Sequence, residues 1–163
     1  MTVGISFAEL LTWGDETSAF WRAHFEAHPA QLDLPSDIGG TANVRELVRH
    51  IWGVELRWVQ RLAELPVTPR EDLPDGPLDA LYEMHLKTAA IFRELLTAPA
   101  ESWDQPFKID WNPSLEMTVT RRKVAGHMLF HGQRHWAQLA TLLRVAGFPS
   151  GFRGDLLLSQ ALE

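Results

Sequence analysis

The sequence contains no cysteine, and this absence removes several classes of site. Disulfide bonds, thiolate zinc sites and a cysteine nucleophile are all excluded. Histidine, aspartate and glutamate are therefore the only strong metal ligands that the chain can offer. The absence of cysteine also agrees with a reducing cytoplasm.

Long apolar segments and long basic runs are missing too. No segment approaches the roughly 18 consecutive apolar residues of a membrane helix, and the first residues lack the basic start and apolar stretch of a signal peptide. The longest basic run is Arg121-Arg122-Lys123, and the 21 acidic and 15 basic residues give a net charge of -6. We therefore expect a cytoplasmic protein that binds neither nucleic acid nor a membrane.

The length of 163 residues corresponds to about one domain, which can bury roughly two thirds of the surface of the unfolded chain. No linker or internal repeat divides the sequence, so a single domain is expected over residues 1–163. Tyrosine is scarce, with one residue against seven tryptophans. Most of these tryptophans fall in helical patterns, which predicts that they fill the core, and a few could instead line a ligand cavity.

Hydrophobic periodicity predicts four long helices. Apolar residues recur at three- and four-residue steps, and proline or glycine ends each pattern. The predicted helices span residues 7–28, about 43–65, 78–96 and 121–146. Residues 66–77 contain four prolines and form a long crossover between the second and third helices.

The second predicted helix has clear end signals and an amphipathic pattern. Asn43 can cap its first turn, and Glu46 can reach back to the Asn43 backbone to complete a capping box. Four arginines lie opposite the apolar stripe, so this basic face is expected in water: Arg45, Arg49, Arg57 and Arg61.

The periodicity changes to that of strands before the fourth helix. Residues 107–111 and 115–119 alternate between apolar and polar, and Asn112-Pro113-Ser114 separates them, which predicts a β-hairpin. Thr120 then caps the fourth helix, and residues 155–162 are predicted to form a short final helix. The expected fold class is all-α: a four-helix bundle with a long crossover between helices two and three and a short β-hairpin insertion before helix four.

Histidines at helical spacing are candidate metal ligands. His127, His131 and His135 follow one another at four-residue steps, so neighbours lie on one helix face about 6 Å apart along the axis. Neighbours can share an ion, whereas His127 and His135, about 12 Å apart, cannot. The pair is therefore 127/131 or 131/135, and the third ligand must come from another helix. His50, on the apolar stripe of the second helix, is the candidate.

Three neutral imidazoles suit a divalent ion such as Zn²⁺, Ni²⁺, Cu²⁺ or Fe²⁺ and leave one position open, as in catalytic sites. Their ring nitrogens should then lie within about 4 Å of one another. The alternative is that each histidine is an ordinary core residue, which is how we interpret His24, His28 and His85, although His85 lies on an apolar face and could line the same cavity. Glu55, on the stripe of His50, is a candidate acid, base or support for a ligand, against the alternative of a solvated or salt-bridged residue.

Two segments of the sequence resemble the DinB/YfiT-like metalloenzyme family. They are Glu46–Trp58, which contains His50, and Val124–Gly147, which contains His131-Gly-Gln-Arg-His135, and the resemblance spans nearly the whole chain. The resemblance implies a four-helix bundle in which a histidine triad binds zinc or nickel at one end of an open cavity. Carried over to this sequence, the metal ligands are His50, His131 and His135, which favours 131/135 over 127/131.

The sequence departs from the family after the first ligand of this pair. The usual His-His-Arg-Gly-Gln is replaced by Arg134-His135-Trp136-Ala137-Gln138, so an arginine is lost, although Arg134 offers a guanidinium one position earlier. Relatives include transferases and isomerases that use low-molecular-weight thiols. The resemblance therefore implies a thiol-dependent transferase, or an isomerase or hydrolase, that acts on a small-molecule substrate with a divalent metal ion and a thiol cofactor. The alternatives are a non-catalytic metal- or ligand-binding bundle and a metal-free bundle that acts through a partner surface. Exposed apolar helix faces would suit a homodimer.

Overall fold

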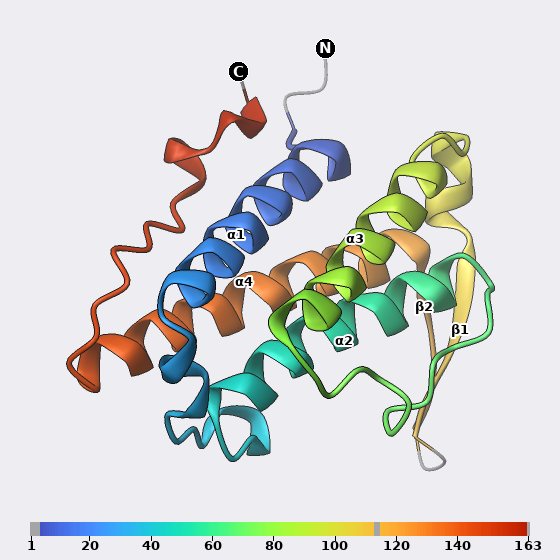
Figure 1. Ribbon diagram of the computed structural model, residues 1–163. Coiled ribbons are helices and arrows are strands. Elements are labelled where there is room, and N and C mark those ends of the chain that lie inside the picture. Colours follow the sequence, from blue (N-terminus) through green and yellow to red (C-terminus); the bar gives the residue numbers. More distant parts are fainter. Residues whose placement is uncertain (1–3, 113–114, 163) are drawn as a thin grey trace.

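The computed structural model describes residues 4–112 and 115–162 and shows a bundle of long helices (Figure 1). The helices are α1 (Phe7–Ala27), α2 (Val44–Leu62), α3 (Leu78–Leu95) and α4 (Arg121–Val145). An antiparallel hairpin of β1 (Pro106–Asn112) and β2 (Leu115–Thr120) precedes α4. The predicted four-helix bundle with a hairpin before helix four is confirmed. In the part of the chain described, no helix is long and apolar enough to cross a membrane.

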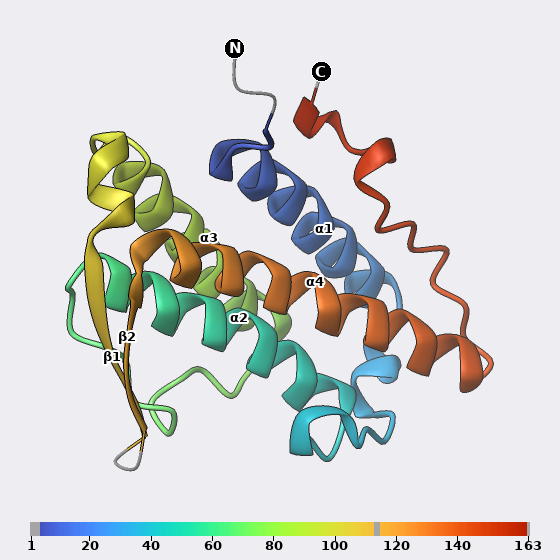
Figure 2. The ribbon, with the colours of Figure 1, turned by 180° about the vertical axis from the view of Figure 1, so that it is seen from behind.

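Each long helix packs against two others, because α1 and α2 both contact α3 and α4. Helix α4 runs between α1 and α2, as Figure 2 shows, and it packs against both. Helix α2 in turn packs against α3. Side chains from α2 and α4 therefore meet along most of the length of the bundle, and these two helices carry the histidines of interest.

Polar side chains cap the N-termini of α2 and α4 at the positions that the sequence indicates. The Asn43 side chain accepts a hydrogen bond from the Glu46 backbone N–H at 2.9 Å, and Thr120 accepts one from Lys123 at 3.2 Å. The predicted capping box at Asn43 is wrong in one bond, because the Glu46 carboxylate accepts from the Ala42 N–H at 2.8 Å. Each of these bonds satisfies a backbone donor that the first helical turn leaves without a partner.

The basic face of α2 holds the crossover rather than facing only water. The Arg49 guanidinium donates to the backbone carbonyls of Arg70, Leu73 and Pro74 at 3.1, 2.8 and 2.8 Å, and Arg45 donates to another crossover carbonyl, that of Gly76, at 3.1 Å. A crossover rich in proline has few backbone N–H donors of its own, so side chains supply the missing donors. Two of the four arginines therefore fix the crossover against α2.

Three tryptophans lie at the centre of the core. Trp21, Trp52 and Trp136 are at most 1% exposed, and the ring of Trp136 packs against both others at centroid distances of 5.6 and 5.5 Å. The Trp52 indole N–H donates to the Ser18 hydroxyl at 3.1 Å, so its polar atom is satisfied. The interpretation of the tryptophans as core residues holds for these three.

The end of helix α2 and the C-terminal segment differ from the sequence-based expectations. Helix α2 ends at Leu62 rather than near residue 65, because Glu64 adopts a left-handed backbone conformation with φ of 56°. The predicted final helix at 155–162 is wrong: the segment forms two short 3₁₀ turns, at Leu156–Leu158 and Gln160–Leu162. The Gln160 N–H donates to Glu16 on α1 at 3.1 Å. Pro113 and Ser114, expected in the hairpin turn, lie outside the described residues.

Candidate metal centre

Three histidines converge between α2 and α4. His50 on α2 and His131 and His135 on α4 each present one ring nitrogen, and these nitrogens lie within 4.8 Å of one another. The ring of His50 is 5.3 Å from that of His131 and 5.1 Å from that of His135, centroid to centroid. Within residues 4–112 and 115–162, no other three histidine, aspartate or glutamate side chains lie this close.

The spacing of the nitrogens is slightly wider than the sequence-based expectation. Bonds of about 2 Å place ligand atoms within about 4 Å of one another, against the 4.8 Å observed. The rings therefore have to rotate inward by a small amount for all three to bind one ion. His135 is 5% exposed and the other two residues are half-buried, so the cluster is largely shielded from water.

The ring nitrogens fit a metal ion because they lack other partners. His50 Nε2, His131 Nδ1 and His135 Nδ1 are buried, and none has a hydrogen-bond partner among the described residues. Buried polar atoms in folded proteins are almost always satisfied, so three unsatisfied nitrogens in one cluster need a common explanation. A divalent ion that accepts their lone pairs supplies one, and neutral imidazole is a suitable donor for such an ion.

The surroundings keep the three rings neutral. Burial, with the nearby His135, lowers the pKa of His50 to about 4. Burial, with the nearby His135 and His50, lowers the pKa of His131 to about 3. Burial together with Arg134 lowers the pKa of His135. All three imidazoles are therefore unprotonated near pH 7, which is the state that binds a metal.

These pKa values predict that the metal-free protein loses stability in acid. Below pH 6.5 these histidines become protonated in the unfolded chain. In the folded chain His50 becomes protonated only near pH 4 and His131 only near pH 3. Stability is therefore highest above pH 6.5 and falls as the pH drops towards 4. We expect the melting temperature with chelator to fall by about 5 °C between pH 7 and 5, after allowing for screening of the partly exposed rings. His131→Gln should show a smaller fall, and an equal fall would contradict this origin.

His127 lies outside the cluster. Its ring is exposed, packs edge-on against Trp58 at 5.5 Å and lies 5.7 Å from the ring of His131. The structure thus brings together the pair 131/135 rather than 127/131. His24, interpreted as an ordinary residue, contacts Gln31 Oε1 through its Nε2 at 2.8 Å.

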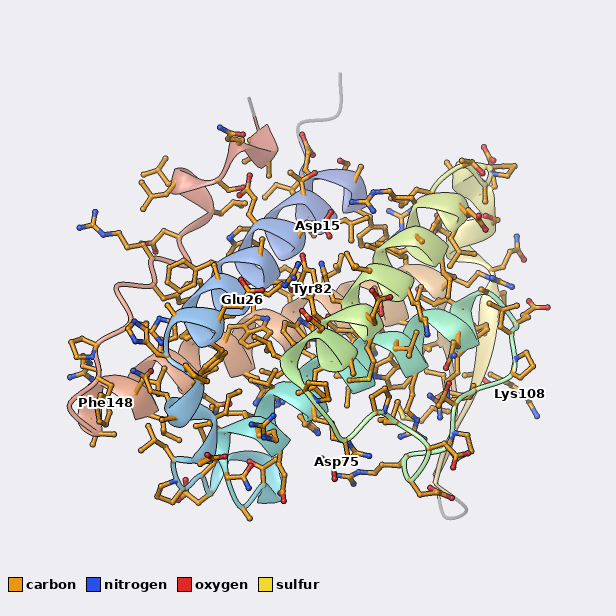
Figure 3. The ribbon with its side chains drawn as sticks, viewed as in Figure 1. Asp15, Glu26, Asp75, Tyr82, Lys108 and Phe148 are labelled. Atoms are coloured by element: carbon orange, nitrogen blue, oxygen red, sulfur yellow. The ribbon has the colours of Figure 1, made fainter. Side chains whose placement is uncertain are left out.

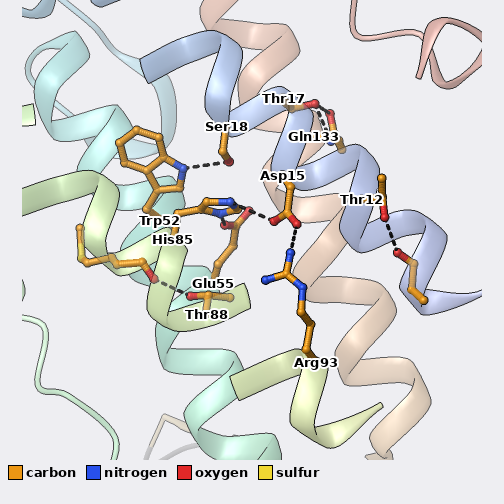
Figure 4. A network of polar contacts seen from close by, with 12 residues as sticks. Thr12, Asp15, Thr17, Ser18, Trp52, Glu55, His85, Thr88, Arg93 and Gln133 are labelled. Carbon is orange, nitrogen blue, oxygen red and sulfur yellow. Dashed lines mark hydrogen bonds and ion pairs between the residues drawn. The ribbon is translucent and has the colours of Figure 1, made fainter. Parts of the chain in front are cut away.

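A second buried polar cluster joins α1, α2 and α3 (Figure 4). His85 Nε2 lies 3.1 Å from Asp15 Oδ1, and His85 Nδ1 lies 3.9 Å from Glu55 Oε2. Arg93 completes the cluster by pairing with Asp15. His85 therefore contacts two carboxylates and does not belong to the histidine group, and sequence reasoning missed Asp15 altogether. The available signal was an acidic residue between Leu11 and Ser18, which are both buried on α1.

The second cluster favours a charged His85. Burial opposes its protonation, but the nearby carboxylates of Asp15 and Glu55 outweigh burial and raise the pKa of His85 to about 9. Burial also raises the pKa of Glu55. Glu55 thus has the salt-bridged role that the sequence left open as an alternative, with a partner on α3.

Gly132 allows this carboxylate to lie against α4. A Cβ built at position 132 would overlap Oε1 of Glu55, whose side chain is 14% exposed. Gly132 lies next to His131 in the sequence, so the packing of Glu55 sets the distance between α2 and α4 close to the candidate ligands. Only a residue without a side chain fits this contact.

Gly132→Ala is therefore expected to destabilise the protein by about 2 kcal/mol, because the buried carboxylate has to move. Gly126, also on α4, is the matched control, since a Cβ there meets no atom within 4 Å. Gly126→Ala should stabilise by about 0.5–1 kcal/mol through helix propensity alone. Urea unfolding of both variants measures the difference. Equal effects at the two positions would mean that Glu55 does not press on α4.

The chain was compared with known families and curated proteins. The sequence profile described as the DinB family matches residues 8–153, which is most of the chain. No curated protein matches the chain.

Proposed function

This chain belongs to the DinB family, and we propose that it is a divalent-metal-dependent enzyme whose ion is held by His50, His131 and His135. The observation that carries the proposal is the convergence of three imidazole rings, each of which also has a buried nitrogen without a hydrogen-bond partner among the described residues. Zinc or nickel is the ion that we propose, because neutral imidazoles suit both. The three lowered pKa values support this assignment, since no ligand has to lose a proton at pH 7.

The proposed reaction is a thiol-dependent transfer to a small electrophile, with isomerisation or hydrolysis as related reactions. When bound, the ion would supply a Lewis acid that stabilises a thiolate or hydroxide near neutral pH. The chain contributes the orientation of the ligands, because His50 is fixed on α2 and the other two ligands on α4. Arg134, whose Nη2 lies 3.1 Å from His135 Nε2, places a positive charge at the edge of the cluster.

One observation favours a non-catalytic alternative. Glu55, the carboxylate nearest in sequence to His50 on its apolar stripe, contacts His85 and does not belong to the histidine group. A metal- or ligand-binding bundle without its own general base is therefore the second candidate function. The two candidates differ in turnover, which a screen of low-molecular-weight thiols with a chromogenic electrophile measures.

Elemental analysis of protein purified without an affinity tag tests the metal site. We expect about one equivalent of Zn²⁺ or Ni²⁺ in the wild type and in His127→Ala, and almost none in His135→Ala. His127→Ala is the matched control, because it removes an imidazole one turn away from His131 on the same helix. If His127→Ala loses the metal and His135→Ala retains it, the ligand pair is 127/131. A wild type without stoichiometric metal after incubation with both ions would refute the proposal.

A further inference from the structure

The cavity beside His50 is lined by an excess of positive charge. It has a volume of about 190 Å³, and its charged lining residues are Arg49, Arg57 and Arg70 with Glu46 and Asp75. Asp75 lies on the crossover, near the start of α3 (Figure 3). Three guanidinium groups against two carboxylates leave one positive charge before any metal is considered.

Two of these arginines are available to a ligand. Arg49 is engaged by three crossover carbonyls, and the Glu46 carboxylate by the Ala42 N–H. In contrast, the Nε of Arg57 is buried and has no hydrogen-bond partner within the part of the chain that the structure describes. Across residues 4–112 and 115–162, neither Arg57 nor Arg70 forms an ion pair with its guanidinium. A buried guanidinium nitrogen without an acceptor is costly, which indicates that an acceptor belongs there.

The histidine cluster adds to the same positive potential. Its three candidate ligands are neutral, so a divalent ion held by them would keep both of its positive charges within the ligand group. Arg70 and Arg134 are close enough to contribute to the lowered pKa of His50. A cavity that concentrates charge of one sign attracts a small ligand of the opposite sign.

We propose that Arg57 and Arg70 bind a carboxylate carried by the small molecule whose thiol or other reactive group faces the histidine cluster. This inference rests on the proposed function and names the class of its substrate: a small organic acid. Guanidinium groups bind carboxylates through paired N–H donors. The single excess charge of the lining matches a carboxylate better than a phosphate dianion. The volume of about 190 Å³ is well above the roughly 10–15 Å³ that a single water molecule needs, which suits a small acid.

The experiment compares two thiols that differ in one group. Protein loaded with Co²⁺ is titrated at pH 7 with mercaptoacetate and with 2-mercaptoethanol, and the visible absorption of the ion reports binding. We expect mercaptoacetate to bind at least about tenfold more tightly, since a charge-assisted pair contributes about 1.4 kcal/mol or more. Arg57→Gln and Arg70→Gln should each reduce this preference to about threefold or less. Arg144→Gln, which removes the same charge from the exposed last turn of α4, should keep it.

The outcomes separate this inference from the proposed function. If wild-type protein gives no Co²⁺ absorption, the metal site itself is wrong. If Co²⁺ binds but the two thiols bind equally, or neither binds, the carboxylate site is refuted while the metal site stands. Arg70 is exposed, so Arg70→Gln tests the site without disturbing the core if Arg57→Gln fails to fold. Inorganic phosphate that displaced mercaptoacetate at a lower concentration than acetate does would overturn the choice of a carboxylate.

Discussion

His50→Ala is expected to abolish the effect of added Zn²⁺ on the melting temperature at pH 7. An ion that binds only the folded state stabilises it by about 4 kcal/mol at a thousand times its dissociation constant, which raises the melting temperature by roughly 8–16 °C for a chain of this size. Without His50 the remaining ligands lie on α4 alone, and an ion bound there no longer links α2 to α4. Scanning calorimetry with and without Zn²⁺ measures both proteins. Equal responses of the two would rule out a site shared by two helices.

The same experiment in acid tests the protonation of the ligands. From free histidine, with a pKa of about 6.5, the sequence alone predicts that protons displace the ion below about pH 5.5. The folded values of about 4 and 3 move this competition to lower pH. The response to Zn²⁺ should therefore persist at pH 5.5 and fade steeply towards pH 4, because several ligands take up protons. A response lost by pH 6 would contradict the lowered pKa values.

His85→Leu is expected to cost about 3–5 kcal/mol of unfolding free energy, because it leaves Asp15 and Glu55 close together without the cation between them. Their side chains are only 28% and 14% exposed, so water replaces the lost partner poorly. Figure 3 shows Asp15 on α1, where it faces α3. The loss should appear in urea unfolding at pH 7. Metal stoichiometry should stay unchanged, because His85 is not part of the histidine group.

A second substitution checks the cause of this loss. Adding Glu55→Gln to His85→Leu removes the carboxylate that is left without a cation, since Asp15 keeps its pairing with Arg93, and should recover about half of the lost stability. The pH dependence of the unfolding free energy tests the charged state of His85 independently. The raised pKa of His85 stabilises the wild type below about pH 6.5, and this contribution disappears as the pH rises through 9. His85→Leu should lack that alkaline loss, and a cost below about 1 kcal/mol would refute the charged cluster.

The sequence predicts the elements of this fold well because they depend on local physics. The positions of the helices follow from the spacing of apolar residues. The caps at Asn43 and Thr120 follow from side-chain oxygens that reach nearby N–H groups. The end of α2 was harder to predict, because a left-handed glutamate at position 64 leaves no compositional signal. The C-terminal 3₁₀ turns were missed because a segment of eight residues depends on its contacts with α1 rather than on its own propensity.

The candidate site could be predicted only in part. Spacing limits the pair on α4 to 127/131 or 131/135, but the helix rotation that brings His135 rather than His127 to His50 depends on packing. The family resemblance supplied this choice. The Asp15–His85–Glu55 cluster joins three helices, so no local pattern could assemble it. The cavity that Arg57 lines together with residues of the crossover could not be predicted either, because it depends on where the crossover packs.

The division of the three histidines between α2 and α4 also affects the order of events during folding. His131 and His135 are one helical turn apart, so an ion can bridge them as soon as this part of α4 is helical during refolding. His50 can join only after the long loop containing α3 and the hairpin has closed. An ion present from the start would therefore speed refolding through α4, whereas the bond to His50 would slow unfolding. One ion would then act on the two rates through different ligands.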